Sequence, residues 1–422
     1  MIVLKGNVIP CTGASMMENA AVVVEDDRIV QVCSQNELHI PDDTQIIELE
    51  KGTIMPGLIE QHCHIGNSGK PSSLAFYCTN PYEETVYMLE ELSELLDAGY
   101  TLIRDVGGTA NFLKKVWKQG KIRSPRIFSS GKLISDTGGH GDELQSFPLE
   151  FSKTGLSGVL IVDGVEECRK GARLMFRDNA DFIKICTTGG VMSEGDCPTH
   201  ANFTVEEIRT FVEEAELKGT YVATHAEGVT GIYNALVGGV KSIEHGTFLD
   251  DRCIELMEKK GAWLVPTLST MYLLTKNKDK LVPWTREKVD GIYEIHCNAA
   301  RKAYEAGIKI GTGTDFIYDR SMMPYGKNAM ELELLTQIGM SPMEALMAAT
   351  RTGAEIILRG DELGTVEEGK LADLIMVKGN PLTDIAILQN AENIPVVIQN
   401  GNVVKNKSVT ENKKLQSSRT IL

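Results

Sequence analysis

The feature that most constrains the fold is a repeated alternation between short apolar runs and helical patterns in the middle of the chain. Runs such as "TLIRDVGG", "DFIKICTTGG", "TYVATHAEG" and "KSIEHGT" are each followed by apolar residues at helical spacing. Eight such units extend from "MPGLIEQHCHIG" to "KIGTGTDF". Alternating strands and helices predict a parallel sheet. Eight units predict a closed (β/α)8 barrel of the TIM type, formed by residues 57–358.

One helix of this region carries explicit end signals. In "TVEEIRTFVEEAELKG", Thr204 is followed three residues later by Glu207, which is the spacing of a capping box. Gly219 is expected to end the same helix, because glycine is the usual residue just beyond a helix C-terminus.

The two ends of the chain both contain short apolar, β-branched runs separated by turn residues, which is the pattern of a small β domain. "AAVVVEDDRIVQVC" reads as a hairpin that turns at Asp26 and Asp27, and "IQNGNVV" places an Asn-Gly turn between β-branched runs. We expect both ends to pair into one β-sandwich domain that comprises residues 1–56 and 359–407. Residues 408–422, rich in Lys, Ser and Asn, are predicted to form a frayed tail.

Composition excludes several classes of function. The 422 residues are 42% hydrophobic and 24% charged, as in a globular protein with room for a barrel and a smaller domain. A net charge of −15 argues against nucleic acid as a partner. No apolar stretch reaches about 18 residues, so no membrane partner is expected. Nine cysteines without a C-x-x-C pair, and no secretory pattern at the start, predict reduced thiols in a cytoplasmic protein.

The stretch "EQHCHIG" permits a metal site, a thiol site or an ordinary core strand when it is taken alone. Strand alternation puts the side chains of His62 and His64 on one side and turns Cys63 to the other, into the layer between strands and helices. Other strand ends narrow the choice, because barrel chemistry gathers where strands end. The polar residues predicted at these ends are His62, His64, Lys184, His225, His245 and Asp315.

Nitrogen and carboxylate groups of this kind suit zinc, and also manganese, iron or nickel. An unmodified lysine cannot join two cations, since its ammonium group only donates hydrogen bonds. A lysine that has reacted with carbon dioxide could join them, because a carbamate presents two anionic oxygens. The alternative for Lys184 is a salt-bridged lysine at the barrel rim.

The run from "MPGLIEQHCHIG" through "IKICTTGG", "ATHAEG", "SIEHGT" and "GTGTDF" resembles the amidohydrolase superfamily, in its subtype with two metals and a carboxylated lysine. The similarity is greatest to the prolidase-like and imidazolonepropionase-related branch. It rests on "DTGGHGD", "CTTGGVMSEGD", "EHGTFLDD" followed by "LVPTLS", and the closing "GTVEEGKLADLIMVKGNPL".

The resemblance implies two divalent cations, with zinc as the expected metal. His62, His64 and Asp315 would hold the more buried ion. His225 and His245 would hold the second, and a carbamate on Lys184 together with a hydroxide would bridge the two. The hydroxide would attack the substrate carbonyl, while Asp315 would take its proton and deliver it to the leaving nitrogen.

Substrate contacts are expected from loops beyond the strands. The resemblance suggests that His140, within "TGGHGD", holds the substrate carbonyl or the oxyanion. Glu227 and Tyr233 follow the fifth strand, and Tyr318 follows the eighth. Some relatives carry an aromatic residue or a second histidine where this chain has Ala226, and use it on a substrate carboxylate. Glu227 is therefore expected to meet a cationic or hydrogen-bond-donating group, although a loop-ordering His140 and a solvated Glu227 remain open.

The expected function is metal-dependent hydrolysis of the C–N bond in a small-molecule amide or dipeptide, as in a prolidase-type dipeptidase or a carboxypeptidase-like enzyme. The alternatives are a cyclic amidase or imidazolonepropionase-like hydrolase, a deaminase, and a non-catalytic assembly protein. The last is disfavoured because every ligand position is kept. Relatives of this kind are often symmetric oligomers, so a homo-oligomer is expected.

Overall fold

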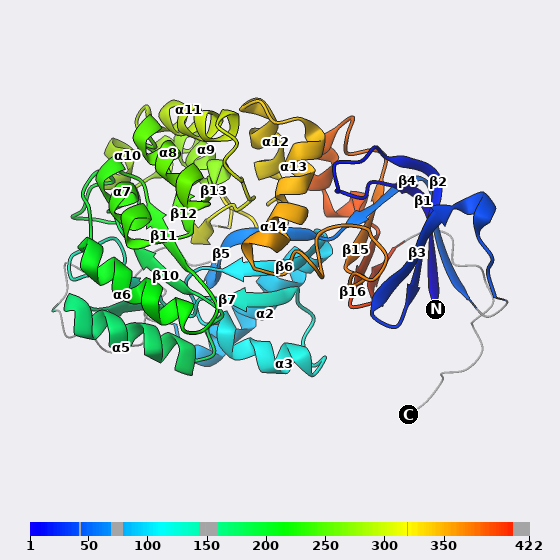
Figure 1. The fold of residues 1–422 in the computed structure, drawn as a ribbon, viewed down its shortest axis with the longest axis horizontal. Helices are drawn as coiled ribbons and strands as arrows, with labels where there is room; N and C mark the ends of the chain where they lie inside the picture. The colour runs from blue at the N-terminus through cyan, green and yellow to red at the C-terminus, as the bar shows by residue number, and fades with distance from the viewer. Residues whose placement is uncertain (42–43, 69–78, 143–147, 149–157, 319, 408–422) are drawn as a thin grey trace.

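The computed structural model describes residues 1–41, 44–68, 79–142, 148, 158–318 and 320–407. The predicted tail at 408–422 lies outside the described residues. Figure 1 shows a large region of helices and strands beside a smaller sheet, to which the first and the last strands of the chain both contribute. The chain therefore leaves the small sheet early, builds the larger region, and returns.

The smaller region contains one mixed sheet of seven strands in the order β17-β16-β15-β4-β1-β2-β3. Its strands are β1 (Ile2–Val8), β2 (Met17–Glu25), β3 (Arg28–Ser34), β4 (Gln45–Pro56), β15 (Leu374–Lys378), β16 (Val396–Gln399) and β17 (Asn402–Asn406). Strand β4 pairs with β1 on one side and with β15 on the other. The N-terminal and C-terminal strands thus form one continuous ladder, not the two packed sheets of the predicted sandwich.

Both predicted hairpins of this sheet are confirmed. Strands β2 and β3 pair antiparallel around Asp26, whose φ is 51°. Strands β16 and β17 pair around Asn400 and Gly401, which have φ values of 48° and 72°. Two successive positive φ angles are what a tight hairpin turn requires, and Asn-Gly adopts them at low cost.

The sheet curls around a core of its own. Leu4, Val22, Leu374 and Ile398, from four different strands, are fully buried in one hydrophobic cluster. Beyond the β2–β3 hairpin, the Ile29 amide donates to the Lys370 carbonyl at 2.9 Å, which draws the far edge of the sheet toward its C-terminal half.

The larger region contains two parallel sheets, in the orders β14-β5-β6-β7 and β13-β12-β11-β10-β8-β9. Their strands are β5 (Leu58–Ser68), β6 (Tyr100–Asp105), β7 (Arg126–Ser129), β8 (Leu133–Ser135), β9 (Val159–Ile161), β10 (Ile183–Cys186), β11 (Val222–Ala226), β12 (Ser242–His245), β13 (Trp263–Val265) and β14 (Phe316–Tyr318). The run "RIFSSGKLIS" is divided between β7 and β8, and β7 pairs with β6 whereas β8 pairs with β10.

Backbone hydrogen bonds join the two sheets at both edges. The Asp181 amide, just before β10, donates to the Ser129 carbonyl of β7 at 2.7 Å. At the other edge the Leu264 amide of β13 donates to the Lys309 carbonyl at 2.9 Å, and the Asp315 amide donates to the His62 carbonyl at 2.8 Å. The segment expected as the eighth strand is therefore irregular, and only β14 at its end is a regular strand.

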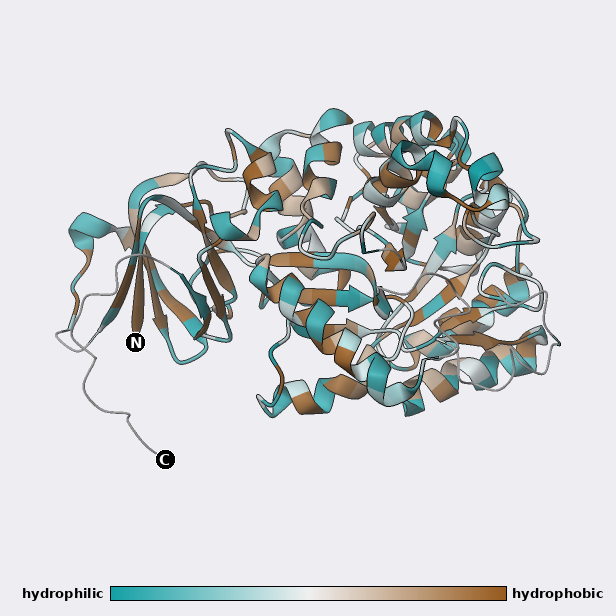
Figure 2. Cartoon of the chain, turned by 180° about the vertical axis from the view of Figure 1, so that it is seen from behind, coloured by the Kyte–Doolittle hydropathy of each residue, from teal (hydrophilic) through white to brown (hydrophobic). Residues whose placement is uncertain are grey.

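Helices cover the outside of these sheets (Figure 1). They are α2 (Pro81–Asp97), α3 (Lys114–Lys118), α5 (Gly164–Arg177), α6 (Val205–Glu216), α7 (Val229–Gly238), α8 (Asp251–Lys260), α9 (Leu268–Lys276), α10 (Pro283–Lys288), α11 (Ile292–Glu305), α12 (Met330–Gln337), α13 (Pro342–Ala348) and α14 (Arg351–Ile356). Figure 2 shows hydrophilic and hydrophobic colours on the same helices, as expected when one face packs on strands and the other meets water.

Helix α6 begins with the predicted capping box between Thr204 and Glu207, and it ends at Glu216, before Gly219.

Among the described residues, no helix combines the length and the apolar character that crossing a bilayer requires.

Candidate metal centre

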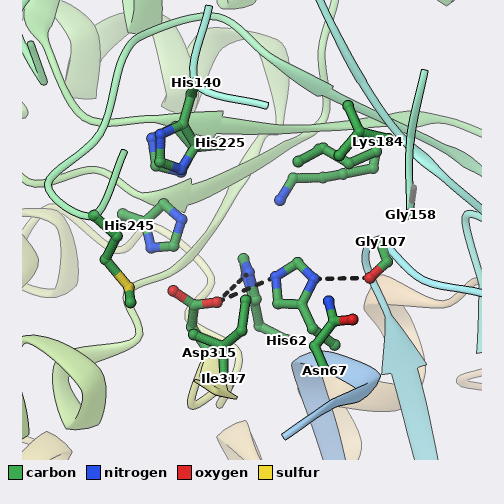
Figure 3. A pocket seen from close by; sticks show the side chains of 14 residues that line it. His62, Asn67, Gly107, His140, Gly158, Lys184, His225, His245, Asp315 and Ile317 are labelled. Carbon is green, nitrogen blue, oxygen red and sulfur yellow. Dashed lines mark hydrogen bonds and ion pairs between the residues drawn. The ribbon is translucent and has the colours of Figure 1, made fainter. Parts of the chain in front are cut away.

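One pocket in the larger region collects all six predicted ligand positions (Figure 3). His62 and His64 come from β5, Lys184 from β10, His225 from β11, His245 from β12, and Asp315 lies just before β14. The pocket holds about 720 Å³ when its open mouth is included, which is the size of a small-molecule site. Residues separated by up to 253 positions in the sequence thus meet because parallel strands end at the same edge.

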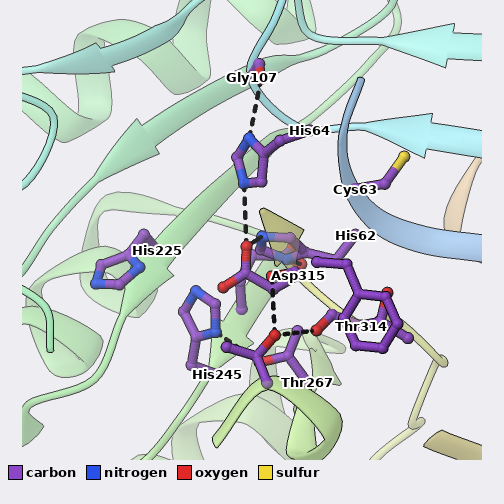
Figure 4. Close-up of polar contacts among 12 residues, drawn as sticks. His62, Cys63, His64, Gly107, His225, His245, Thr267, Thr314 and Asp315 are labelled. Atoms are coloured by element: carbon purple, nitrogen blue, oxygen red, sulfur yellow. Dashed lines mark hydrogen bonds and ion pairs between the residues drawn. The ribbon is translucent and has the colours of Figure 1, made fainter. Parts of the chain in front are cut away.

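Asp315 lies at the centre of the histidine cluster (Figure 4). Its Oδ1 is 3.4 Å from His62 Nε2 and 3.2 Å from His64 Nε2. Ligand atoms of His62, His245 and Asp315 all lie within 4.8 Å of one another, which is the spacing that a single cation can bridge.

Two of the histidines have a protonation pattern fixed by backbone carbonyls. His64 Nδ1 is 2.9 Å from the Gly107 carbonyl, and His225 Nε2 is 3.1 Å from the Gly189 carbonyl. A carbonyl only accepts, so each of these nitrogens carries the proton. The other ring nitrogen is left with a lone pair, which is the form that binds a metal.

The other two histidines are fixed by side chains. His62 Nδ1 donates to the Glu244 carboxylate at 2.8 Å. His245 Nδ1 is 2.7 Å from Thr267 Oγ1, whose own proton goes to the Pro266 carbonyl at 2.6 Å. Thr267 must therefore accept from His245, and in both neutral rings Nε2 is the nitrogen that can bind a cation.

Three residues of the site adopt left-handed backbone conformations that ordinary side chains avoid. The φ angles are 70° for His245, 55° for Thr267 and 55° for Asp315. Each conformation costs about 1 kcal/mol or more, and such strain is concentrated at functional sites. His296, which received no role from the sequence, bonds through Nε2 to the His245 carbonyl at 2.9 Å and so helps to hold this bend.

Glu244 and Arg104 form a buried ion pair beneath His62 that sequence reasoning missed. Arg104 donates to Glu244 Oε2 at 2.6 Å, and both side chains are fully buried. Burial opposes ionisation of Glu244, but Arg104 and His62 outweigh it and lower the pKa of this carboxyl to about 2. A charged residue inside each of the strands "TLIRD" and "SIEHG" was the signal that could have revealed the pair.

Lys184 is buried in the pocket wall, with 1% of its surface exposed. Among the residues that the structure describes, its ammonium has no hydrogen-bond or ion-pair partner. Burial lowers the pKa of Lys184, although the charges of Glu244 and Asp315 oppose the shift. A lowered pKa increases the neutral fraction of the amine, and the neutral form has the lone pair that reaction with carbon dioxide requires.

The charge states of the other ligands also suit cation binding. Burial, reinforced by neighbouring cationic groups, holds the pKa of His225 and of His245 well below the ordinary value, so both rings are neutral. Burial would raise the pKa of Asp315, but the adjacent His62, His64 and His245 hold it well below its usual range. His225 and His245 therefore offer neutral imidazoles, and Asp315 offers an anionic carboxylate.

His140 reaches the pocket from the loop after β8. Its ring stacks on the ring of His225, with centroids 4.0 Å apart and planes 17° apart. His140 Nδ1 is 2.8 Å from Ser193 Oγ and 3.5 Å from Asp196 Oδ2. A Cβ at Gly190 would come within 2.2 Å of the imidazole, so glycine is needed there.

Asp196 in turn is held by Ser193 at 2.6 Å and by Lys288 of α10 at 2.8 Å. Although burial opposes it, hydrogen bonds and charge from His140 and the bond from Lys288 lower the pKa of Asp196. The carboxylate is thus anionic and fixes the orientation of the His140 ring.

The remaining predicted substrate residues differ in position. Glu227 lines a second cavity that adjoins the first, and burial raises its pKa to about 7. Tyr233 lies on α7 with the Arg252 guanidinium 3.5 Å above its ring, and the structure does not bring it to either cavity. Tyr318 belongs to β14, and its side chain lies outside the described part of the chain.

Cys63 points away from the two histidines that flank it, as strand alternation predicted (Figure 4). It is fully buried in the main hydrophobic core, and its Sγ contacts the Arg104 carbonyl at 3.6 Å. Burial also holds the pKa of this thiol well above its ordinary value, so the position and the chemistry of Cys63 both favour a packing role over a thiol site.

The chain is similar to known proteins over most of its length. The model of the Amidohydrolase family matches residues 53–404. An ochratoxinase from Aspergillus niger is 33% identical, over 97% of this chain and 87% of its own length. An imidazolonepropionase from Geobacillus sp. (strain WCH70) is 25% identical, over 92% of this chain and 91% of its own.

Among solved structures, an Xaa-Pro dipeptidase with bound methionine in the active site is 31% identical and superposes with a TM-score of 0.88, covering 96% of this chain and 100% of its own. A match of this extent in sequence and in fold leaves no large part of the chain unaccounted for. The chain therefore belongs to the amidohydrolase family.

Proposed function

We propose that this protein is a metal-dependent hydrolase that cleaves the amide C–N bond of dipeptides or similar small amides. One observation carries the proposal. Each of the four predicted ligand histidines has one ring nitrogen engaged by an oxygen atom, while its ring lines the same cavity as Asp315 and Lys184. Histidines that serve only as core residues are not expected to line one cavity together, each with one ring nitrogen bonded to an oxygen and the other available for a cation.

The residues fit a pair of divalent cations. His62, His64 and Asp315 would hold one cation, and His225 and His245 the other. Lys184 has no partner among the described residues, and as a carbamate it would supply two oxygens for both cations. When bound, such cations make water acidic enough to act as a nucleophile near neutral pH, and they polarise a carbonyl. Zinc is our proposed metal, because neutral imidazole and carboxylate are its usual ligands.

Two side chains of the pocket would handle the reacting atoms. The ionised Asp315 carboxylate can accept a proton as the nucleophile forms and return it to the amide nitrogen, which leaves poorly unless it is protonated. His140 keeps Nδ1 toward Ser193 and Asp196, so its Nε2 is the atom that can contact a substrate oxygen. With a proton on Nε2 the ring would donate to a developing oxyanion, and the nearby Asp196 anion would favour that form.

The dipeptidase assignment is supported by the Xaa-Pro dipeptidase among the structural relatives. We also infer that the two parallel sheets, bonded at both edges, act as one (β/α)8 barrel over residues 57–358, and that residues 1–56 and 359–407 form the separate domain. In such a barrel the catalytic site lies where the strands end, which is where His225 and His245 stand.

A substrate panel with parallel metal analysis tests the proposal. The purified protein would be loaded with zinc in bicarbonate and assayed on dipeptides, N-acyl amino acids, cyclic amides and amino-substituted heterocycles. We expect two metal ions per chain and turnover of dipeptides. Turnover of cyclic amides alone would instead support an imidazolonepropionase-like activity, and release of ammonia from heterocycles would support a deaminase. Absence of bound metal would favour a non-catalytic role.

A further inference from the structure

A second cavity of about 350 Å³ adjoins the metal pocket. His140, Met192, His225, His245 and Asp315 line both spaces, so the two cavities are continuous around these side chains. A molecule whose carbonyl lies at the ligand cluster can therefore extend into the second cavity.

Two acidic residues line the second cavity, Asp315 and Glu227, and of these Asp315 also lines the metal pocket whereas Glu227 does not. Only 3% of its side chain is exposed. Its Oε2 accepts a hydrogen bond from Thr247 Oγ1 at 2.9 Å, and the Val191 amide is a second donor. Within the described part of the chain, no lysine or arginine lies at ion-pair distance from Glu227, and its Oε1 is 3.7 Å from His225 Nε2.

Other buried carboxylates near the site have a cationic partner or a full set of hydrogen-bond donors. Glu244 is paired with Arg104, and Asp196 is paired with Lys288. Glu60 forms no ion pair with the lysines and arginines that the structure describes, but the His62 amide, the Thr314 amide and hydroxyl, and the Asn328 side chain all donate to it. Glu60 lines neither cavity. Glu227 therefore differs from the others in facing an open space with acceptor capacity to spare.

We propose that the second cavity binds a positively charged amino group of the substrate, with Glu227 as its counter-ion. The Glu227 carboxylate lines the cavity out of reach of any described lysine or arginine, and an incoming ammonium would supply a positive charge together with strong hydrogen-bond donors. The inference rests on the proposed amide hydrolysis and specifies its substrate class. It favours dipeptides and aminoacyl amides with a free α-amino group over N-acylated amino acids.

Side chains around Glu227 suit the rest of an aminoacyl unit. Val191 and Met271 contribute apolar surface, Met192 joins them at the boundary between the cavities, and Thr270 contributes a hydroxyl-bearing wall. An aliphatic first residue would pack against the valine and the two methionines, while its ammonium meets Glu227. Methionine adapts to side chains of different shape, so we expect broad tolerance for that residue.

The test compares each dipeptide with its N-acetyl derivative, using the metal-loaded protein. We expect wild-type kcat/KM to favour the free amine by at least about tenfold, because a charged hydrogen bond is lost on acetylation. Glu227→Gln should lower kcat/KM for the free dipeptide about 10- to 100-fold, mainly through KM, and should move the preference ratio toward one. Glu206→Gln, on an exposed position of α6, is the matched control and should leave the ratio unchanged.

A binding measurement separates the inference from the proposed function. An amino alcohol has no scissile amide, so its binding does not depend on turnover. We expect it to raise the melting temperature of the wild type, and to do so far less for Glu227→Gln or when the alcohol is N-acetylated. If neither dipeptide nor acetyl dipeptide is cleaved while this shift persists, the proposed hydrolysis fails and the cation site stands.

The opposite result overturns the inference. If the wild type cleaves N-acetyl dipeptides as fast as free ones, and Glu227→Gln lowers both rates equally with a loss of bound metal, no cation site exists. Glu227 would then be a positioning residue that supports His225 across their 3.7 Å separation.

Discussion

Replacement of Glu244 by glutamine tests whether the buried pair beneath the proposed metal site sustains both stability and metal affinity. Glutamine has the same shape, and its oxygen can still accept from His62 and Arg104. Its amide group can donate to Ser242 Oγ, which now donates to Glu244 Oε1 at 2.5 Å. The substitution therefore removes the negative charge while it keeps most of the hydrogen bonds, and it leaves the Arg104 charge buried without a counter-ion.

Two independent routes give a similar magnitude for this loss. Removing one partner of a buried ion pair typically costs about 3–5 kcal/mol. The pKa of Glu244 is lowered from its ordinary 4.5 to about 2. At 1.36 kcal/mol for each pH unit, this lowering corresponds to about 3 kcal/mol of folding stability at pH 7.

The pH dependence has a definite sign. Because the folded-state pKa is depressed, the stabilisation is complete above pH 4.5 and is lost as the pH falls toward 2. The difference in unfolding free energy between wild type and Glu244→Gln should therefore shrink from about 3 kcal/mol at pH 7 to about 1.4 kcal/mol at pH 3. Urea unfolding of metal-free protein in chelator measures it without the added stability that bound metal would give.

The same variant should bind metal about 10- to 100-fold more weakly, because a neutral partner orients His62 less firmly. Glu258→Gln on the exposed face of α8 is the matched control, with an expected change below about 0.5 kcal/mol. If Glu244→Gln unfolded like the control and bound metal like the wild type, the account of Glu244 as a link between Arg104 and His62 would be refuted.

Four further substitutions address the pocket. Lys184→Ala should reduce metal content measured by mass spectrometry and abolish hydrolysis, with partial rescue by a small added carboxylate. Asp315→Asn should retain most of the metal yet lower kcat by about 10²- to 10⁴-fold, and a near-normal kcat would rule out its role as proton carrier. Asp196→Asn should lower kcat about 10- to 100-fold through misplacement of His140 while metal content stays constant. Cys63→Ala should cost about 1–2 kcal/mol of unfolding free energy and leave kcat unchanged, whereas a large loss of kcat would restore a chemical role for the thiol.

The convergence of the six predicted ligand positions on one pocket could be predicted from the sequence, because it depends on local rules. A histidine or aspartate that ends a predicted barrel strand is brought to one edge by the fold, whatever the details of the helices between. Strand alternation then sorts His62 and His64 from Cys63 without any knowledge of their surroundings. The hairpin at Asn400 and Gly401 was predictable for the same reason, since the turn needs two residues that accept positive φ.

Features that depend on pairing between distant segments were not predictable. The split between β7 and β8 depends on which neighbour each half pairs with, and "RIFSSGKLIS" contains no sign of it. The single seven-stranded sheet depends on β4 having β1 on one side and β15 on the other. Either arrangement satisfies the same apolar pattern in the individual strands, so the pattern cannot distinguish a sandwich from a continuous sheet.

Glu227 and Tyr233 show that closeness to His225 in the sequence does not by itself place a side chain in the pocket. Both follow His225, and the sequence offered the same reason for placing each in the pocket. Glu227 directly follows β11, so the strand aims it at the site. Helix α7 begins at Val229, and from there a side chain's direction is set by packing against neighbouring helices. Tyr233 accordingly faces Arg252 of α8. Specificity in this pocket should therefore change with residues immediately after the strands, and much less with residues one helical turn further along.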